Sequence, residues 1–224
     1  MYVKRETVSK TWPIPRKGTK YIVAPSHNKQ SGIPLLVVMR DVLKLVDKRK
    51  ELKQVLLEGK ILVNNKIVKE ENYSLALFDT ISIQIMKAYY RVELSSNGKI
   101  HLHEIKESDA NHKISKVTGK KILKKNLIQL NLDDGRNLIS KEKINVSDSV
   151  LINFKDKKID QVIPIKEKAK IVVIGGKHLG KSGIVEKISD KEVVIKSDEK
   201  ELNISKSEVI AVRWVNKKWI RWEK

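Results

Sequence analysis

The stretch from Gly32 to Ile85 decides the fold of this chain, and it opens with PLLVVMRDVLKL at residues 34–45. Apolar residues recur here at helical spacing, with Arg40, Asp41 and Lys44 between them. Pro34 stands where a first helical residue can lack its N–H group. The pattern therefore predicts a helix over residues 34–46.

A second helix and a β-hairpin follow in the same stretch. Asp47 can cap the second helix through its carboxylate, and Gly59 supplies a left-handed stop. Residues 59–68 then read GKILVNNKIV, in which the pair Asn64-Asn65 tolerates the positive φ of a tight turn between two strands. Residues 78–83 predict a third strand. The stretch thus reads as a small helix-helix-hairpin module.

Composition adds the charge of the whole chain. The 224 residues contain 47 Lys and Arg against 27 Asp and Glu, a net charge of +20, and no cysteine. This excess indicates attraction to a polyanion, usually nucleic acid, although a lysine-rich but otherwise ordinary surface is the alternative. No apolar run approaches the ~20 residues that span a bilayer. The absence of cysteine excludes disulfides and Cys-based metal sites.

The first 31 residues form a basic N-terminal arm. Pro13 and Pro15 hold the segment around Trp12 extended. An extended basic arm with an aromatic residue can follow a phosphate backbone and stack on a base. Alternatively, Trp12 folds back onto the domain. The first interpretation assigns RNA contacts to Lys4, Arg5, Lys10, Trp12, Arg16, Lys17 and Lys20.

The helix-helix-hairpin module, residues 32–86, resembles RNA-binding domains of the S-four type through residues 34–45 and 59–66. Such domains occur in ribosomal proteins, pseudouridine synthases and tyrosyl-tRNA synthetases. In them, basic residues of the two helices and the hairpin edge meet structured RNA. The resemblance implies RNA contacts by Arg40, Lys44, Lys48, Arg49 and Lys60.

The preceding WPIPRKG at residues 12–18 narrows the resemblance. It is similar to the N-terminal signature of the S-four-e family of archaeal and eukaryotic small-subunit ribosomal proteins, with Lys4 and Arg5 at the family's spacing. Tyr2, Glu6 and Ser9 depart from that signature.

Residues 87–165 read as a central β domain, with predicted strands at 89–94, 99–105, 127–132, 137–139, 150–154 and 159–163. His101 and His103 share one strand face and could be a metal pair, but no third ligand lies close in sequence. We expect solvent-facing histidines and no metal. Lys120 and Lys121 form a basic cluster that is either an RNA contact or a solvated loop.

Residues 166–212 contain GGKHLGKS at 175–182, which satisfies the Walker A pattern. A nucleotide-binding loop requires a helix after the Lys-Ser pair, whereas Gly183 and the Val and Ile residues that follow favour a strand. Strand, glycine-rich loop and strand together resemble a KOW motif, a small β-barrel element. That resemblance implies RNA contacts by Lys177, His178 and Lys181 rather than a nucleotide cofactor.

Residues 213–224 form a basic, Trp-rich C-terminal tail. We assign Trp214 to the core. Arg and Trp side chains together suit stacking and phosphate pairing. The predicted RNA contacts here are Arg213, Lys217, Lys218, Trp219 and Arg221.

The predicted fold class is α+β and multidomain: the helix-helix-hairpin module, a central β domain and a KOW-type β-barrel. The resemblance implies a cytoplasmic, structural, non-enzymatic constituent of the small ribosomal subunit. Its expected partners are small-subunit ribosomal RNA and neighbouring small-subunit proteins, with no membrane, cofactor or small-molecule substrate. The alternative is an RNA-modifying enzyme or RNA-binding regulator that carries an S-four-type module.

Overall fold

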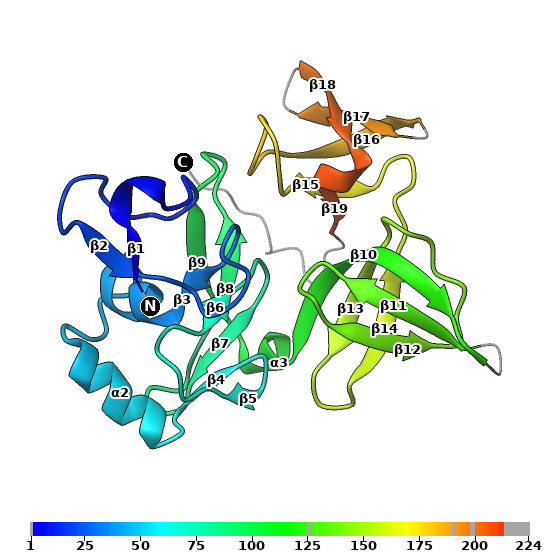
Figure 1. Ribbon diagram of the computed structural model, residues 1–224. Coiled ribbons are helices and arrows are strands. Elements are labelled where there is room, and N and C mark those ends of the chain that lie inside the picture. Colours follow the sequence, from blue (N-terminus) through cyan, green and yellow to red (C-terminus); the bar gives the residue numbers. More distant parts are fainter. Residues whose placement is uncertain (1, 125–126, 190, 198–199, 213–224) are drawn as a thin grey trace. The chain divides into compact units, whose positions relative to one another are not determined.

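The structure is a computed structural model that describes residues 2–124, 127–189, 191–197 and 200–212 (Figure 1). The fold is mostly β with few helices. It divides into two units. Unit 1 comprises Met1–Lys113 and Asn153–Lys157, and unit 2 comprises Ile114–Ile152 and Lys158–Lys224.

Unit 1 is built around a five-stranded sheet in the order β5-β4-β7-β8-β9. Its strands are β1 (Tyr2–Lys4), β2 (Tyr21–Val23), β3 (Ile33–Pro34), β4 (Ile61–Val63), β5 (Lys66–Ile67), β6 (Ser74–Leu75), β7 (Thr80–Ile83), β8 (Ala88–Leu94) and β9 (Ile100–Ile105). Its helical elements are the 3-10 turn η1 (Arg5–Thr7), α1 (Leu35–Val37), the π-helical η2 (Val38–Val42), α2 (Arg49–Leu57) and α3 (Glu107–Ala110). Strands β1 and β2 pair, as do β3 and β6.

The predicted hairpin is confirmed. Asn64 and Asn65 have φ of 51° and 61°, and Val63 pairs with Lys66 across the turn. Gly59 directly follows Glu58, the C-cap residue of α2, and has φ of 70°. All three positions need left-handed backbone, which Asn and Gly adopt at low cost.

The first predicted helix is corrected. Pro34 lies in β3, with ψ of 142°, and precedes a short α1 that continues as η2. The first amides after it, of Leu35 and Leu36, donate to the carbonyls of Tyr73 and Glu71 instead of leaving helical donors free. All residues from Leu35 to Met39 are buried. This segment therefore packs on all sides and does not present one apolar face to the core and one polar face to solvent.

The predicted cap of α2 is also corrected. Lys48, not Asp47, is the N-cap residue, and its side chain makes no capping bond. The carboxylate of Glu51 instead accepts from the backbone N–H groups of Asp47 and Lys48, at 3.0 and 3.2 Å. These bonds to its charged form lower the pKa of Glu51.

The main sheet of unit 1 runs through the boundary predicted at residues 86 and 87. Ser82 of β7 pairs with Tyr89 of β8, and Val92 of β8 pairs with Leu102 of β9. Strands predicted for the central β domain thus share a sheet with the hairpin of the helix-helix-hairpin stretch. Local sequence gives no signal for this because sheet membership depends on pairing between strands.

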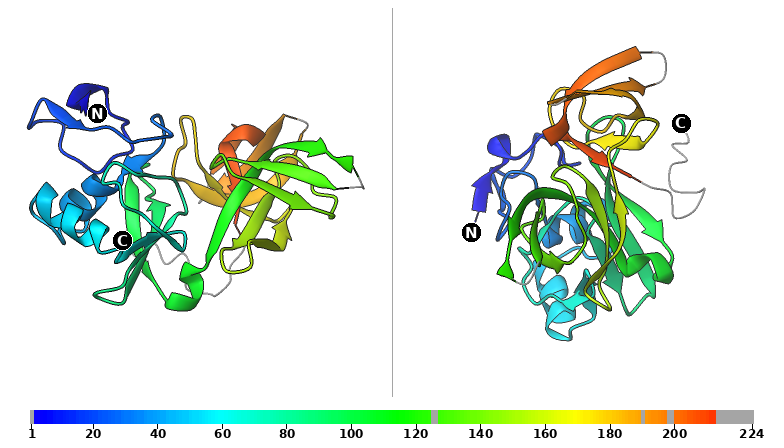
Figure 2. Two further views of the ribbon diagram at one scale, coloured as in Figure 1. Left: turned by 60° about the horizontal axis from the view of Figure 1, so that its bottom comes forward. Right: turned by 90° about the vertical axis from the view of Figure 1, so that its right-hand side faces the viewer.

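Unit 2 contains two five-stranded sheets, in the orders β12-β11-β10-β13-β14 and β18-β17-β16-β15-β19. Figure 2 shows that the first sheet curls strongly. The strands are β10 (His112–Ile122, which begins in unit 1), β11 (Ile128–Leu132), β12 (Asn137–Ser140), β13 (Ser149–Asn153), β14 (Lys158–Ile163), β15 (Lys170–Val173), β16 (Ser182–Ile188), β17 (Glu192–Ser197), β18 (Lys200–Ser205) and β19 (Val209–Ala211). A 3-10 turn, η4 (Lys206–Glu208), precedes β19.

The second sheet of unit 2 encloses its own apolar core, which includes Ile171, Val173, Val185, Val193, Ile195 and Val209. Gly183 is needed here because a Cβ at this position would lie 2.6 Å from the backbone oxygen of Lys196 on β17. The glycine thus allows β16 and β17 to approach closely.

Gly183→Ala is expected to lower the free energy of unfolding by about 1–3 kcal/mol, the cost of overpacking against a backbone atom that cannot move freely. Gly119→Ala on β10 is the control, because its nearest heavy atom would lie 3.6 Å away. Urea unfolding of both variants checks this. Equal effects at the two positions would contradict the close approach of β16 and β17.

Candidate nucleic-acid interface

The N-terminal arm is folded back on itself, not extended as the sequence predicts. Strands β1 and β2 pair antiparallel, from Tyr2 with Val23 to Lys4 with Tyr21. The guanidinium of Arg5 donates to the carbonyl oxygens of Thr19 and Pro15, at 2.7 and 2.8 Å, and to Thr19 Oγ1 at 2.8 Å. Arg5 therefore closes the loop of residues 15–19, which we call the arm loop.

A basic cavity of about 360 Å³ opens beside the arm loop. Its lining consists of Lys4, Arg5, Glu6, Arg16, Lys17, Gly18, Thr19 and Lys20. Gly18 has φ of 141°, and a Cβ there would lie 3.1 Å from the Arg5 guanidinium. Five cations against one carboxylate make this cavity suited to an anionic group such as a phosphate.

Trp12 is not part of this surface, which corrects its predicted role in RNA stacking. It is only 3% exposed, and its Nε1–H donates to the Gly32 carbonyl at 3.2 Å. The alternative interpretation, that Trp12 folds back onto the domain, is therefore correct. Lys10 is exposed, and its backbone oxygen accepts from Lys99 Nζ at 2.7 Å.

Three predicted cations of the helix-helix-hairpin stretch already have carboxylate partners. Arg40 pairs with Asp41 at 2.9 Å, and Lys60 Nζ lies 2.9 Å from Glu58. The hydrogen bond from Arg40 raises the pKa of that arginine. Arg49 donates hydrogen bonds through Nε and Nη2 to the carboxylate of Glu71, and these bonds raise the pKa of Arg49. These pairs reduce the charge that the three residues can offer to RNA.

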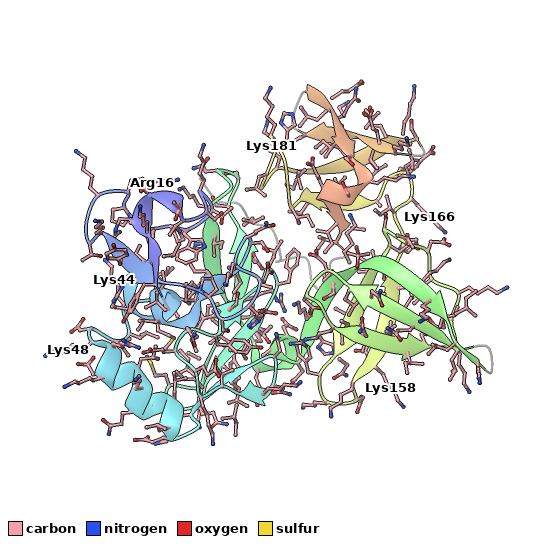
Figure 3. The ribbon with its side chains drawn as sticks, in the orientation of Figure 1. Arg16, Lys44, Lys48, Lys158, Lys166 and Lys181 are labelled. Carbon is pink, nitrogen blue, oxygen red and sulfur yellow. The ribbon has the colours of Figure 1, made fainter. Side chains whose placement is uncertain are left out.

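Lys44 and Lys48 remain exposed between η2 and α2. Figure 3 shows both side chains along the same edge of unit 1 as Arg16. Lys50 and Lys53 on α2 are exposed as well. Neither Lys50 nor Lys53 is among the predicted RNA contacts, although their three-residue spacing is the helical signal that places both on one face.

Arg49 also joins the arm to α2. Besides pairing with Glu71, it donates through Nη1 to the hydroxyl of Tyr2 on β1, at 2.8 Å. Arg49 is therefore a positioning residue that holds the arm loop and the exposed lysines of α2 in one unit.

Tyr2→Phe is expected to speed amide exchange in β1 and β2 by about 2- to 10-fold, because one hydrogen bond is worth ~0.5–1.5 kcal/mol. Hydrogen–deuterium exchange of residues 2–23 measures this without any change in charge. Tyr21→Phe removes the matched hydroxyl from the neighbouring strand and is the control. The same exchange in both variants would mean that Arg49 does not hold the arm.

In unit 2, Lys120 and Lys121 lie on β10, which the sequence did not predict, so they are not in a loop. Both are exposed, but successive residues of a strand point to opposite faces, so the two do not form one cluster. Lys120 Nζ lies 3.5 Å from the Ile144 carbonyl.

The glycine-rich loop connects β15 to β16, so Ser182 opens a strand and not a helix. The helix N-terminus that a Walker-type nucleotide site requires is thus absent after this loop. The carboxylate of Glu208 occupies the space where a side chain at Gly176 would lie. Lys177 and Lys181 are exposed and His178 is half-buried, and Figure 3 shows Lys181 pointing away from the sheet.

The five cationic and aromatic contacts predicted in the C-terminal tail lie outside the described residues. They are Arg213, Lys217, Lys218, Trp219 and Arg221. Trp214, predicted as core, lies outside them too.

His101 and His103 are exposed on one face of β9. They stand opposite Glu93 and Arg91 of β8. Burial raises the pKa of Glu93 to about 7, and burial followed by the charges of His101 and Arg91 lowers the pKa of His103. Among the described residues, no three His, Cys, Asp or Glu side chains converge as metal ligands would.

A buried lysine that the sequence analysis missed joins the two sheets of unit 2. Lys116 on β10 is 4% exposed, and its ammonium donates to the carbonyls of Lys206, Ser207 and Val209. Burial lowers the pKa of Lys116 to about 8 from the ordinary 10.5. The sequence signal for this buried lysine is its place between the apolar residues Ile114 and Val117 of one strand.

The stability of unit 2 is expected to rise between pH 8 and 10.5 relative to a Lys116→Met variant. Below pH 8 Lys116 is charged in both the folded and the unfolded chain, so the whole free-energy cost of burying its charge lowers the stability of the folded state. Between the two pKa values the unfolded chain binds more protons, so the free energy of unfolding increases with pH. Urea unfolding across this range tests the sign, and a parallel pH dependence of the two proteins would contradict it.

Known proteins resemble this chain in sequence. The model of the ribosomal family S4e matches residues 86–159. The small ribosomal subunit protein eS4 of Methanocella arvoryzae is 40% identical over 190 residues, covering 84% of this chain and 80% of the relative. That of Nanoarchaeum equitans is 35% identical over 216 residues, covering 93% and 90%.

A solved structure resembles this chain in fold. The crystal structure of the 30S ribosomal protein S4e from Thermoplasma acidophilum matches with a TM-score of 0.70 and 30% identity, over 82% of this chain and 96% of that chain. This match and the sequence identity of the relatives show that the chain belongs to the S4e family of ribosomal proteins.

Proposed function

We propose that this chain is a structural constituent of the small ribosomal subunit that binds ribosomal RNA through the exposed cations of its arm loop and of α2. The observation that carries the RNA surface is the basic cavity of the arm loop, where Arg5 holds Arg16, Lys17 and Lys20 around one opening. The S4e relatives are named as small-subunit proteins, which supports a structural and non-enzymatic role in the cytoplasm.

The finer assignment of modules is part of the same proposal. Residues 32–86, from β3 through β7, act as an S-four-type module. Residues 87–165 act as a central β region whose first strands, β8 and β9, extend the sheet of that module, and residues 166–212 act as a KOW-type element. Residues 1–31 and 213–224 are basic flanks. The hairpin with its Asn64-Asn65 turn supports the first, and the β15-loop-β16 arrangement supports the KOW assignment.

Lys177, His178 and Lys181 are proposed to reach RNA from the glycine-rich loop, and Lys121 from the curled sheet. No helix among the described residues is long and apolar enough to cross a membrane. Neighbouring small-subunit proteins are the expected protein partners.

The salt dependence of binding tests the RNA interaction. Binding of the full chain to small-subunit ribosomal RNA should weaken steeply, because each neutralised phosphate adds about 0.7–0.9 to the slope of log K against log salt. With six or more phosphates contacted, affinity falls by roughly 10³-fold between 50 and 200 mM salt. A flat response would contradict electrostatic binding.

A further inference from the structure

Four large aliphatic side chains of unit 1 are mostly exposed. Leu57 at the end of α2 is 74% exposed, Ile67 of β5 is 59% exposed, and Ile85 and Met86 in the turn between β7 and β8 are each 57% exposed. Single exposed apolar residues are common, but a contiguous group of them marks an interaction surface.

The backbone brings these four residues to one corner of the sheet. A Cβ on Gly59, two residues after Leu57, would lie 3.5 Å from Cγ2 of Ile67. The N–H of Gln84, just before Ile85 and Met86, donates to the Lys60 carbonyl at 3.0 Å. Residues 57, 67, 85 and 86, which we call the aliphatic corner, therefore lie where α2 ends, where β5 pairs at the sheet edge and where β7 turns into β8, all close to Gly59 and Lys60 along the chain or through these contacts.

The chemistry of the aliphatic corner favours a protein over RNA. RNA is held by cations and by aromatic rings that stack on bases. Leu, Ile and Met offer neither, and their burial is favourable only against another apolar surface, at about 25 cal/mol per Å². Strand β5 is also the edge of its sheet at this corner.

The charges around the aliphatic corner indicate the kind of protein. Lys60 Nζ is held 2.9 Å from Glu58, so this pair is internally neutral, and Lys60 lowers the pKa of Glu58. Lys66 and Lys87 are exposed immediately beside Ile67 and Met86. The rim is therefore positive.

We infer that the aliphatic corner docks a neighbouring protein of the small subunit that presents aliphatic side chains flanked by carboxylates. The carboxylates meet Lys66 and Lys87, and the aliphatic groups cover Leu57, Ile67, Ile85 and Met86. This inference rests on the proposed function, because it requires the chain to be in the subunit.

Methionine chemistry provides the test. The chain has three methionines, of which Met86 is exposed and Met39 is 2% exposed. Met86 should be oxidised by dilute peroxide in the free chain and be protected about tenfold in purified small subunits, because interface cores exclude water. Met39, slow to react in both, is the internal reference.

Photo-methionine incorporated at the same positions identifies what covers Met86. The expected adduct joins Met86 to a peptide from another small-subunit protein at a site with nearby Asp or Glu. An adduct with RNA, or oxidation of Met86 in subunits at the rate of the free chain, would overturn the inference. Absence of the whole chain from small subunits would instead refute the proposed function.

A pair of neutral variants links protection to the aliphatic corner. Leu57→Ser with Ile67→Ser should restore most of the Met86 oxidation in subunits while leaving the salt slope of RNA binding unchanged. Ile122→Ser with Ile139→Ser removes matched side chains, 77% and 63% exposed in unit 2, and should leave Met86 protected. Continued protection in the first variant would also overturn the inference.

Discussion

Replacing Asp79 with alanine is expected to lower the free energy of unfolding of unit 1 by about 3–5 kcal/mol, because it removes the carboxylate that forms a buried ion pair with the Lys113 ammonium. Asp79 is 4% exposed and Lys113 is 2% exposed, with 2.6 Å between Oδ1 and Nζ. The same carboxylate accepts from Asn64 Nδ2 at 2.8 Å and from the Ala76 N–H at 2.7 Å. The variant therefore also leaves the hairpin turn without its support.

Urea unfolding followed by hydrogen exchange in peptides of unit 1 measures the effect of Asp79→Ala. Asp41→Ala is the control, because it removes a carboxylate from the half-exposed pair with Arg40 and should cost about 1 kcal/mol or less. Equal losses in the two variants would show that the buried pair does not hold the hairpin.

Replacing Arg16, Lys17 and Lys20 together with glutamine is expected to reduce the salt slope of RNA binding by about 2–3. At 0.1 M salt this corresponds to a loss of roughly 10²-fold in affinity, since the electrostatic contribution vanishes near 1 M. The three cations line the basic cavity of the arm loop, while Arg5, which shapes it, stays in place.

A variant with Lys155, Lys157 and Lys158 changed to glutamine has the same net charge and is the matched control. These lysines are exposed at the turn between β13 and β14, and none of them is among the predicted RNA contacts. Filter binding with small-subunit ribosomal RNA over a salt series compares the two. If both triple variants lose affinity equally, net charge alone drives binding and the arm loop is not a site.

Local signals predicted the parts of the fold that depend on neighbouring residues. Asn64-Asn65 and Gly59 required positive φ, and the structure has it at all three positions. The residues after Ser182 favour a strand, and the structure has strand β16 there. A Walker-type loop would need a helix at this place, so that interpretation is wrong. In each case the backbone preference of a few residues settles the conformation.

Long-range contacts explain the errors. The local pattern predicts Pro34 as a first helical residue, but Pro34 pairs with Ser74, forty residues away. The surrounding charge in the sequence favours base stacking by Trp12, whereas its ring is buried and donates a hydrogen bond to Gly32, as the alternative interpretation predicts. The resemblance predicts an RNA contact at Arg49, but Glu71 and Tyr2, which bond its guanidinium, are distant in sequence.

The candidate site is accordingly narrower than the sequence indicates. Arg40, Arg49 and Lys60 are ion-paired, Trp12 is buried, and the arm loop gathers Arg16, Lys17 and Lys20 around one cavity. Such convergence could not be predicted, because the side chain of Arg5 closes the loop through contacts 10 to 14 residues away.

Sedimentation of small subunits tests the central claim most directly. The tagged chain, expressed in cells of its own type, should migrate with the small-subunit peak of a sucrose gradient at moderate salt and leave that peak as salt is raised. The arm-loop triple variant should leave it at lower salt than the Lys155, Lys157 and Lys158 control. A chain that remains at the top of the gradient at every salt concentration would contradict its assignment as a small-subunit constituent.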